Sequence, residues 1–137
     1  MADAFLVGVN GNYAEVDSCG NVAVGFSKGS VTKVINAVEV TTTSSEIDCQ
    51  GFNAILVQTA ITNSKNWTVK VQGSLTSGGT FVDWYELANT GSMAAMSHLH
   101  SAGQGFIFKG IPDYVKIVAT EEVDGGACTV TVQPMNV

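Results

Sequence analysis

The sequence contains no arginine, and its few charged residues are spread thinly along the chain. Only 13% of the 137 residues are charged, and 12 acids against 6 lysines give a formal net charge of −6. Proteins that bind nucleic acid cluster cations to displace the counterions of the phosphates, whereas these lysines stand singly. We therefore expect no nucleic-acid partner. The acidity and the lack of any apolar run near the roughly 20 residues that span a bilayer predict no membrane partner either.

Cysteine is scarce and follows no recognisable pattern. Cys19, Cys49 and Cys128 are odd in number and widely spaced, which fits neither a disulfide framework nor a zinc motif. The first residues lack the basic segment and long apolar stretch of a secretory signal. These features predict synthesis in the cytoplasm and three reduced cysteines that act as small apolar side chains.

The residues that are abundant predict an all-β fold. Hydrophobic residues make up 45% of the chain, and Val and Thr together contribute 32 residues. β-Branched side chains favour strands, and low charge with this hydrophobic content argues against disorder and coiled coils. The length fits one domain of ordinary size.

The N-terminal third resembles an arm of short strands and turns. Asn10 and Gly11 lie between two β-prone segments, and Asn-Gly is the strongest two-residue signal for a hairpin. The neutral polar stretch at residues 41–45 is typical of a connector. We therefore place an arm at residues 1–44 and a β-sandwich at residues 45–137.

Turn signals in the second part recur at the spacing of sandwiches and barrels. Trp67, Val69 and Val71 alternate with polar residues, and Cys128 and Val132 belong to a second alternating segment, so each predicts a strand with one buried face. Residues 92–102 have partly helical spacing, but a strand is favoured because a helix there would have no acidic first turn. With that strand, the region holds about eight, the number of a jelly-roll-like sandwich.

Two groups of residues have the chemistry of metal ligands. On a strand, His98 and His100 share a face and offer two donors to zinc or copper, but no third donor is evident. The simpler interpretation is two partly exposed histidines. Glu121, Glu122 and Asp124 precede two glycines, which suits either a calcium site or a solvated hairpin turn. The turn is favoured, and we expect no metal and no cofactor.

Aromatic residues suggest a possible sugar-binding face. Trp84 and Tyr85 are adjacent on an expected strand, so only one of them faces outward. Trp67 shares its face with valines and belongs to the expected core. The hydrolase elbow and the phosphate-binding loop are absent, so we expect no catalytic activity.

Several segments resemble the small jelly-roll or β-sandwich head decoration (cement) proteins of tailed bacteriophages. The main one is VQGSLTSGGTFV at residues 71–82, a strand followed by a glycine turn and a second strand. SEIDCQGF at residues 45–52 and IPDYVKI at residues 111–117 flank it at comparable places, and AEVDSCGNVAV at residues 14–24 is similar to an N-terminal hairpin of phage virion proteins. Lys116 stands where such sequences often have arginine.

The resemblance implies a non-catalytic virion protein on the capsid exterior, synthesised in the host cytoplasm. Its partners would be the major capsid protein and further copies of itself, in a homotrimer that braces neighbouring capsomers. The arm would clasp the shell or an adjacent subunit, or alternatively cover an edge of its own sandwich. Its expected anchors are apolar residues of the first 26 positions: Phe5, Leu6, Tyr13, Val22, Val24 and Phe26. Alternative functions are a tail or fibre module and a carbohydrate-binding module that uses Trp84 or Tyr85.

Overall fold

A computed structural model describes residues 4–7, 13–16, 27–87 and 91–137 of the chain. The described residues form fourteen strands and no helix, which confirms the all-β prediction. Within this part of the chain no helix has the length and apolar character needed to cross a membrane.

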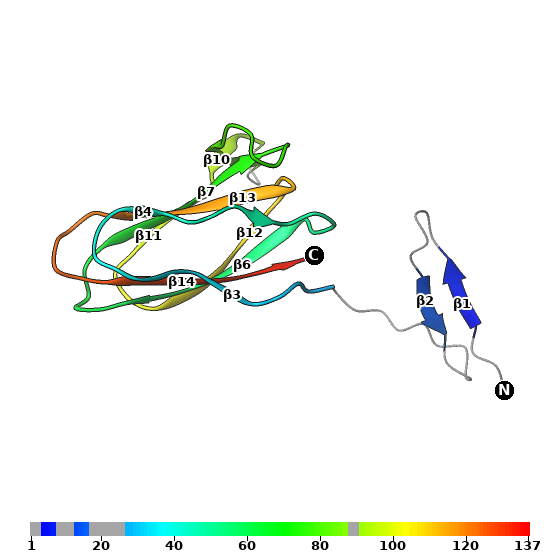
Figure 1. The fold of residues 1–137 in the computed structure, drawn as a ribbon, viewed down its shortest axis with the longest axis horizontal. Coiled ribbons are helices and arrows are strands. Elements are labelled where there is room, and N and C mark those ends of the chain that lie inside the picture. The colour runs from blue at the N-terminus through cyan, green and yellow to red at the C-terminus, as the bar shows by residue number, and fades with distance from the viewer. Residues whose placement is uncertain (1–3, 8–12, 17–26, 88–90) are drawn as a thin grey trace.

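Two antiparallel sheets pack face to face (Figure 1). The first sheet has the order β12-β6-β14-β3, formed by Gln104–Lys109, Ala54–Ile61, Cys128–Met135 and Thr32–Val38. The second has the order β11-β7-β13-β4, formed by Ser97–His100, Trp67–Ser74, Tyr114–Glu121 and Thr42–Thr43. The short β5 (Ile47–Asp48) continues the edge that β4 begins, because it also pairs with β13.

The strands pair in nested order, from the two ends of the amino-acid sequence between β3 and β14 inward. β3 pairs with β14, β4 and β5 pair with β13, β6 pairs with β12, and β7 pairs with β11. Two further pairings, β14 with β6 and β13 with β7, join these ribbons into the two sheets. A long antiparallel ribbon rolled up in this way is a jelly roll, as the sequence predicted.

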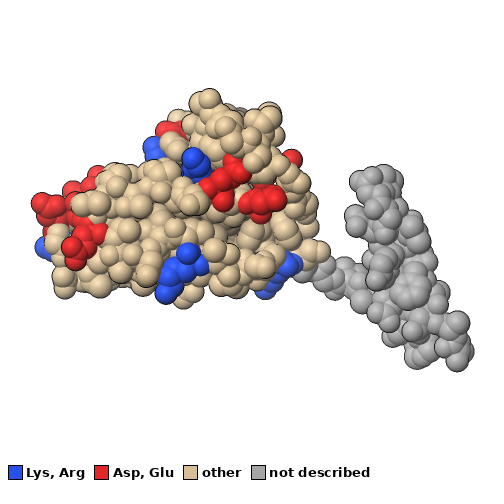
Figure 2. All heavy atoms as spheres, in the orientation of Figure 1, with Lys and Arg blue, Asp and Glu red and all other residues tan. Residues whose placement is uncertain are grey.

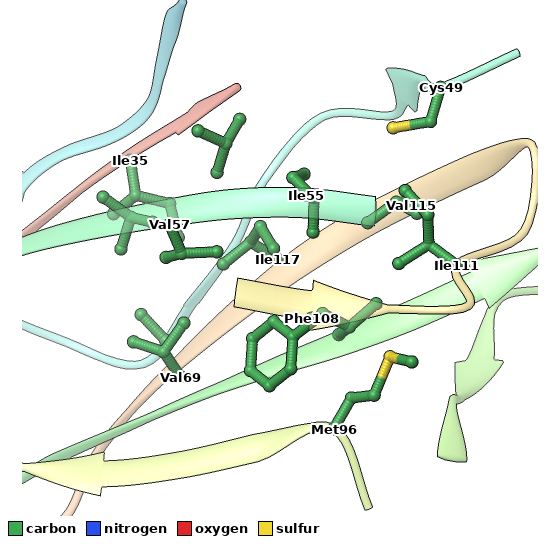
Figure 3. Packing of buried hydrophobic residues seen from close by; sticks show 14 of the residues in the cluster. Ile35, Cys49, Ile55, Val57, Val69, Met96, Phe108, Ile111, Val115 and Ile117 are labelled. Atoms are coloured by element: carbon green, nitrogen blue, oxygen red, sulfur yellow. The ribbon is translucent and has the colours of Figure 1, made fainter. Parts of the chain in front are cut away.

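The core lies between the sheets and consists of alternate residues of each strand. Figure 3 shows Ile35, Ile55, Val57 and Phe108 of the first sheet facing Ile117 and other residues of the second. The predicted inward residues are buried, with exposed fractions of 0% for Trp67, Val69, Cys128 and Val130 and 1% for Val71 and Val132.

The arm is shorter than the sequence suggested. β3 lies within residues 1–44, yet it pairs with β14, and its Ile35 is 3% exposed in the core. The boundary therefore falls before β3 and not near Ser44. The local sequence is misleading because the partner of β3 lies at the other end of the chain.

Ser44 belongs to the core and not to a connector. Its backbone N–H donates to the carbonyl of Ile117 at 2.8 Å, and its Oγ accepts the N–H of Ile117 at 2.9 Å. The hydroxyl thus replaces a strand partner between β4 and β5.

The N-terminal hairpin is confirmed as a two-stranded sheet of its own. β1 (Ala4–Val7) pairs antiparallel with β2 (Tyr13–Val16), and Val7 lies opposite Tyr13. The Asn10-Gly11 turn and the turns expected up to residue 26 lie outside the described residues.

Residues 75–100 differ in detail from the prediction. The expected strand at residues 80–87 is divided into β8 (Val82–Asp83), which pairs with β7, and β9 (Tyr85–Leu87). β9 pairs with β10 (Met93–Ala95) in a separate two-stranded sheet, which we call the flap. Residues 92–102 contain strands β10 and β11 and no helix, as favoured.

Ser44→Ala removes the acceptor of the buried Ile117 N–H, and an unmet buried donor costs about 1–3 kcal/mol. We expect a loss of that size in the free energy of unfolding measured by urea denaturation. Ser45→Ala is the matched control, because Ser45 is exposed. Its backbone carbonyl, which accepts a hydrogen bond from the Ser44 hydroxyl, is unchanged by the substitution. Equal stability of the two variants would contradict the role of Ser44.

Candidate interaction surfaces

The outer face of the β12-β6-β14-β3 sheet carries no carboxylate. None of its four strands contains Asp or Glu, although the chain has 12 acids, and its only charged residues are Lys33 and Lys109 on the two edge strands. The outward positions in the middle are neutral: Leu56 and Gln58 on β6 lie opposite Gln133 and Thr131 on β14. We call this the neutral face.

The neutral face is hollowed near its centre. A hollow of about 770 Å³ is lined by Leu56, Gln58, Ile107, Thr131 and other residues of β6, β12 and β14. Gly105 lies opposite Gln58 and has no side chain to fill the space. Apolar and hydrogen-bonding groups alternate across this hollow, so it suits the uncharged side chains of a protein partner.

The carboxylates lie off this face. One group is at the end of the sandwich where β7 begins (Figure 2, left), and another, which includes Glu46 beside the turn after β7, is nearer its other end. Partial desolvation raises the pKa of Glu121, and so do a hydrogen bond with Asp124 and the negative charges of Asp124 and Glu39. Among the described residues no group of three or more His, Cys, Asp or Glu side chains is placed to hold a metal ion. Glu121 ends β13, and Glu122 and Asp124 lie in the turn that follows it.

The two histidines share a face of β11, as predicted from their spacing. Their rings stack with centroids 5.3 Å apart, and both rings contact Phe106. Nε2 of His98 lies 2.9 Å from Oε1 of Gln104, and Nε2 of His100 lies 2.7 Å from Oγ1 of Thr59. These contacts tie β11 of one sheet to β6 and β12 of the other, so the pair closes one side of the sandwich.

Trp84 lies between β8 and β9 and Tyr85 begins β9, and only Tyr85 faces solvent, as expected of one of the two. Trp84 packs against the core, and its Nε1 donates to the carbonyl of Gly110 at 3.0 Å. Tyr85 is 50% exposed. Of the two rings predicted as candidates for stacking on a sugar, Tyr85 is thus the one that faces solvent.

The flap presents an apolar face that the sequence analysis did not identify. Leu87 and Met93 are paired across the two strands, as are Tyr85 and Ala95, so all four side chains point to one side. The exposed fractions are 71% for Leu87 and 63% for Met93. In Figure 2 the flap is the mainly tan projection at the top of the molecule.

Other residues of interest lie on the N-terminal hairpin. Phe5 and Leu6 belong to β1 and Tyr13 belongs to β2. Val22, Val24 and Phe26 lie outside the described residues. The predicted role of all six as anchors stays a prediction.

Comparison with known proteins identifies the fold. No protein-family model matches the chain, and no curated protein matches it. The solved structure of the SPBc2 prophage-derived protein YomS is similar, with a TM-score of 0.59 and 16% identity over 85% of this chain and 100% of YomS. The PBSX exported protein XepA gives a TM-score of 0.62 and 17% identity over 88% of this chain and 42% of XepA. The chain thus matches the whole of YomS but less than half of XepA, and at these identities the likeness is one of fold.

The buried histidine predicts a dependence of stability on pH. Desolvation lowers the pKa of His100. The hydrogen bond between the His100 ring and the carbonyl of His98 opposes this change, and the charge of the His98 ring lowers the pKa further, so the net direction is downward. The unfolded chain therefore takes up a proton at His100 at a higher pH than the folded chain does. Stability from this group is complete above the unfolded pKa, near 6.5, and falls as the pH drops below it.

We expect the urea midpoint of the wild type to fall between about pH 7.5 and pH 5.5, by more than that of His100→Gln. The carboxylates titrate in both proteins, so the difference between the two profiles isolates the histidine. Parallel profiles would show that His100 has no shifted pKa.

Proposed function

We propose that this protein is a structural component of a bacteriophage particle, a decoration (cement) protein that binds the outer surface of the capsid and braces neighbouring capsomers. Its jelly roll is shared with a prophage-derived protein, YomS, and its turn patterns resemble those of head decoration proteins. In this proposal the protein acts by adhesion, without catalysis, and the capsid exterior is its location.

The observation that carries the proposal is the neutral face. A protein of net charge −6 keeps one complete four-stranded sheet free of carboxylates. Burying charged groups against a partner without compensation costs several kcal/mol per ion, whereas neutral hydroxyl and amide groups exchange water for protein hydrogen bonds at little net cost. The neutral face is therefore the surface best suited to lie on a broad partner, which we propose is the major capsid protein.

The β1–β2 hairpin has the role of the arm in this proposal. A lone two-stranded hairpin is at best marginally stable in water, so it gains stability by pairing with the capsid or with an adjacent subunit in a homotrimer. β3 belongs to the sandwich, so the arm ends before it.

Two other functions receive less support. A carbohydrate-binding module would have to use Tyr85, because the Trp84 ring lies against the core and Tyr85 is 50% exposed. A tail or fibre module has the same fold requirements, and the number of copies per particle distinguishes it: hundreds for a shell protein and few for a tail part.

A single carboxylate placed on the neutral face tests the proposal. Thr131→Glu puts a charge beside the hollow, and we expect it to weaken binding to capsids purified without this protein at least about tenfold, or about 1.4 kcal/mol. Thr68→Glu is the matched control, because Thr68 lies near the start of β7, on the outer face of the other sheet, and is similarly half-buried. Equal binding by both variants, or a map of the particle with the neutral face toward solvent, would refute the proposed orientation.

Removal of residues 1–26 separates the arm from the sandwich. We expect the truncated protein to melt cooperatively, because every strand of the two sheets remains, and to lose affinity for capsids. Removal of residues 1–44 is the contrasting variant, since it deletes β3 and leaves β14 without a partner on one side. If the shorter deletion abolished the cooperative melt, the hairpin would instead cover an edge of its own sandwich.

A further inference from the structure

The apolar face of the flap gathers several exposed hydrophobic side chains on one small surface. Six of the ten exposed large hydrophobic side chains in this part of the chain lie between residues 75 and 99. They are Leu75, Val82, Tyr85, Leu87, Met93 and Leu99. Three of them, Tyr85, Leu87 and Met93, stand with Ala95 on one side of the flap. Apolar side chains gathered in this way mark an interaction surface more often than single exposed ones do.

The flap is held firmly, so its exposed face is not the result of loose attachment. Val71 of β7 donates its N–H to the carbonyl of Met96 at 2.9 Å and accepts the N–H of Trp84 at 3.1 Å. Met96, which is 1% exposed, donates its own N–H to the carbonyl of Trp84 at 3.0 Å. These two residues flank the flap strands β9 and β10, and both are fixed to the same point of β7.

A glycine allows this attachment. A Cβ atom at Gly73 would lie 2.8 Å from the Trp84 ring and 2.4 Å from the Pro112 ring. Only a residue without a side chain lets both rings pack on β7 at that position. Gly73, Trp84 and the buried Met96 thus hold the flap on β7, while the side chains on its outer side are apolar.

Charge indicates which partner covers the flap. Glu86 lies between Tyr85 and Leu87 and therefore points to the opposite side of the flap. Asp83, at its base, is paired with Lys70 at 3.0 Å and accepts a hydrogen bond from Gln72 at 3.1 Å. The apolar face thus has no unpaired charge of its own to match with charges of a partner.

The acidic end of the sandwich lies away from the flap. Glu121 is opposite Trp67 at the start of β7, whereas β8 and the flap are attached near Gly73, at its other end. Two copies of a chain with net charge −6 repel each other, and this repulsion is smallest when they meet at an uncharged surface with their acidic ends apart. An apolar face is also complementary to a second copy of itself.

We propose that the flap is the contact surface between copies of this chain, with Leu87 and Met93 at its centre. The neutral face lies on a different sheet and stays free in such an assembly. The inference therefore does not depend on the capsid-binding role, and each is tested separately.

The test replaces both central side chains, Leu87→Ser and Met93→Ser, in the full chain. We expect the wild type to sediment as an oligomer at about 100 μM and the double variant to sediment as a monomer of 14.3 kDa, a weakening of at least about tenfold. The matched control is Val31→Ser with Val40→Ser, because both valines are 66% exposed and lie outside the flap. A monomeric wild type, or a double variant that keeps the wild-type mass, would overturn the proposal.

A charge-pair experiment keeps the proposal testable if the double variant fails to fold. Ala95→Lys and Ala95→Glu each place a charge on the apolar face, and we expect each variant alone to be monomeric and a mixture of the two to associate. No association in the mixture would count against contact between flaps. Thr131→Glu is expected to keep the wild-type oligomer, so loss of capsid binding and loss of self-association are distinguishable.

Discussion

The two-residue period of a β-strand is the constraint on which the rest of this structure depends. Each strand gives half of its side chains to the space between the sheets and half to the outside. Trp67 shows how strongly burial dominates the inner half: it is 0% exposed although its indole N–H has no hydrogen-bond partner among the described residues. An unmet donor costs about 1–3 kcal/mol, while burying roughly 150–250 Å² of aromatic surface contributes about 4–6 kcal/mol at about 25 cal/mol per Å². The core is therefore fixed by apolar burial, and the outer half of each strand is available for recognition.

Local patterns were sufficient to predict the fold class but not the membership of every strand. The alternation of apolar and polar residues around Trp67 and around Val130 can be seen within a few neighbouring positions. Both segments are strands with the predicted faces inward. The local sequence places β3 in the arm because its pairing partner, β14, is distant in the sequence. Ser44 was interpreted as part of a connector because its neighbours are polar, yet its hydroxyl binds the backbone of β13. Both errors concern contacts that only the folded chain creates.

The interaction surfaces were harder to predict for the same reason. The absence of acids from four separate segments is visible in the sequence, but only the strand order brings these segments into one sheet. Leu87 and Met93 lie in segments that read as ordinary strands, and their exposure follows from the departure of the flap from the main sheets. Alternation did predict that one of Trp84 and Tyr85 faces outward, and the packing of Trp84 decides which one it is.

The distribution of charge connects the two surfaces. The strands of the neutral face carry no acids, and the described carboxylates of residues 27–137 lie in turns, on strands of the other sheet and, at Glu86, on the flap. Four of them gather near the turn after β13. The flap emerges from the opposite end of β7 and leaves its apolar side free of charge. Each molecule thus has a neutral sheet, an apolar flap and a group of carboxylates in separate places. In our proposals the neutral sheet meets the capsid and the flap meets further copies of the chain, while the carboxylates oppose other association. A protein that adheres at defined places without aggregating needs this separation, since low overall charge alone favours indiscriminate association.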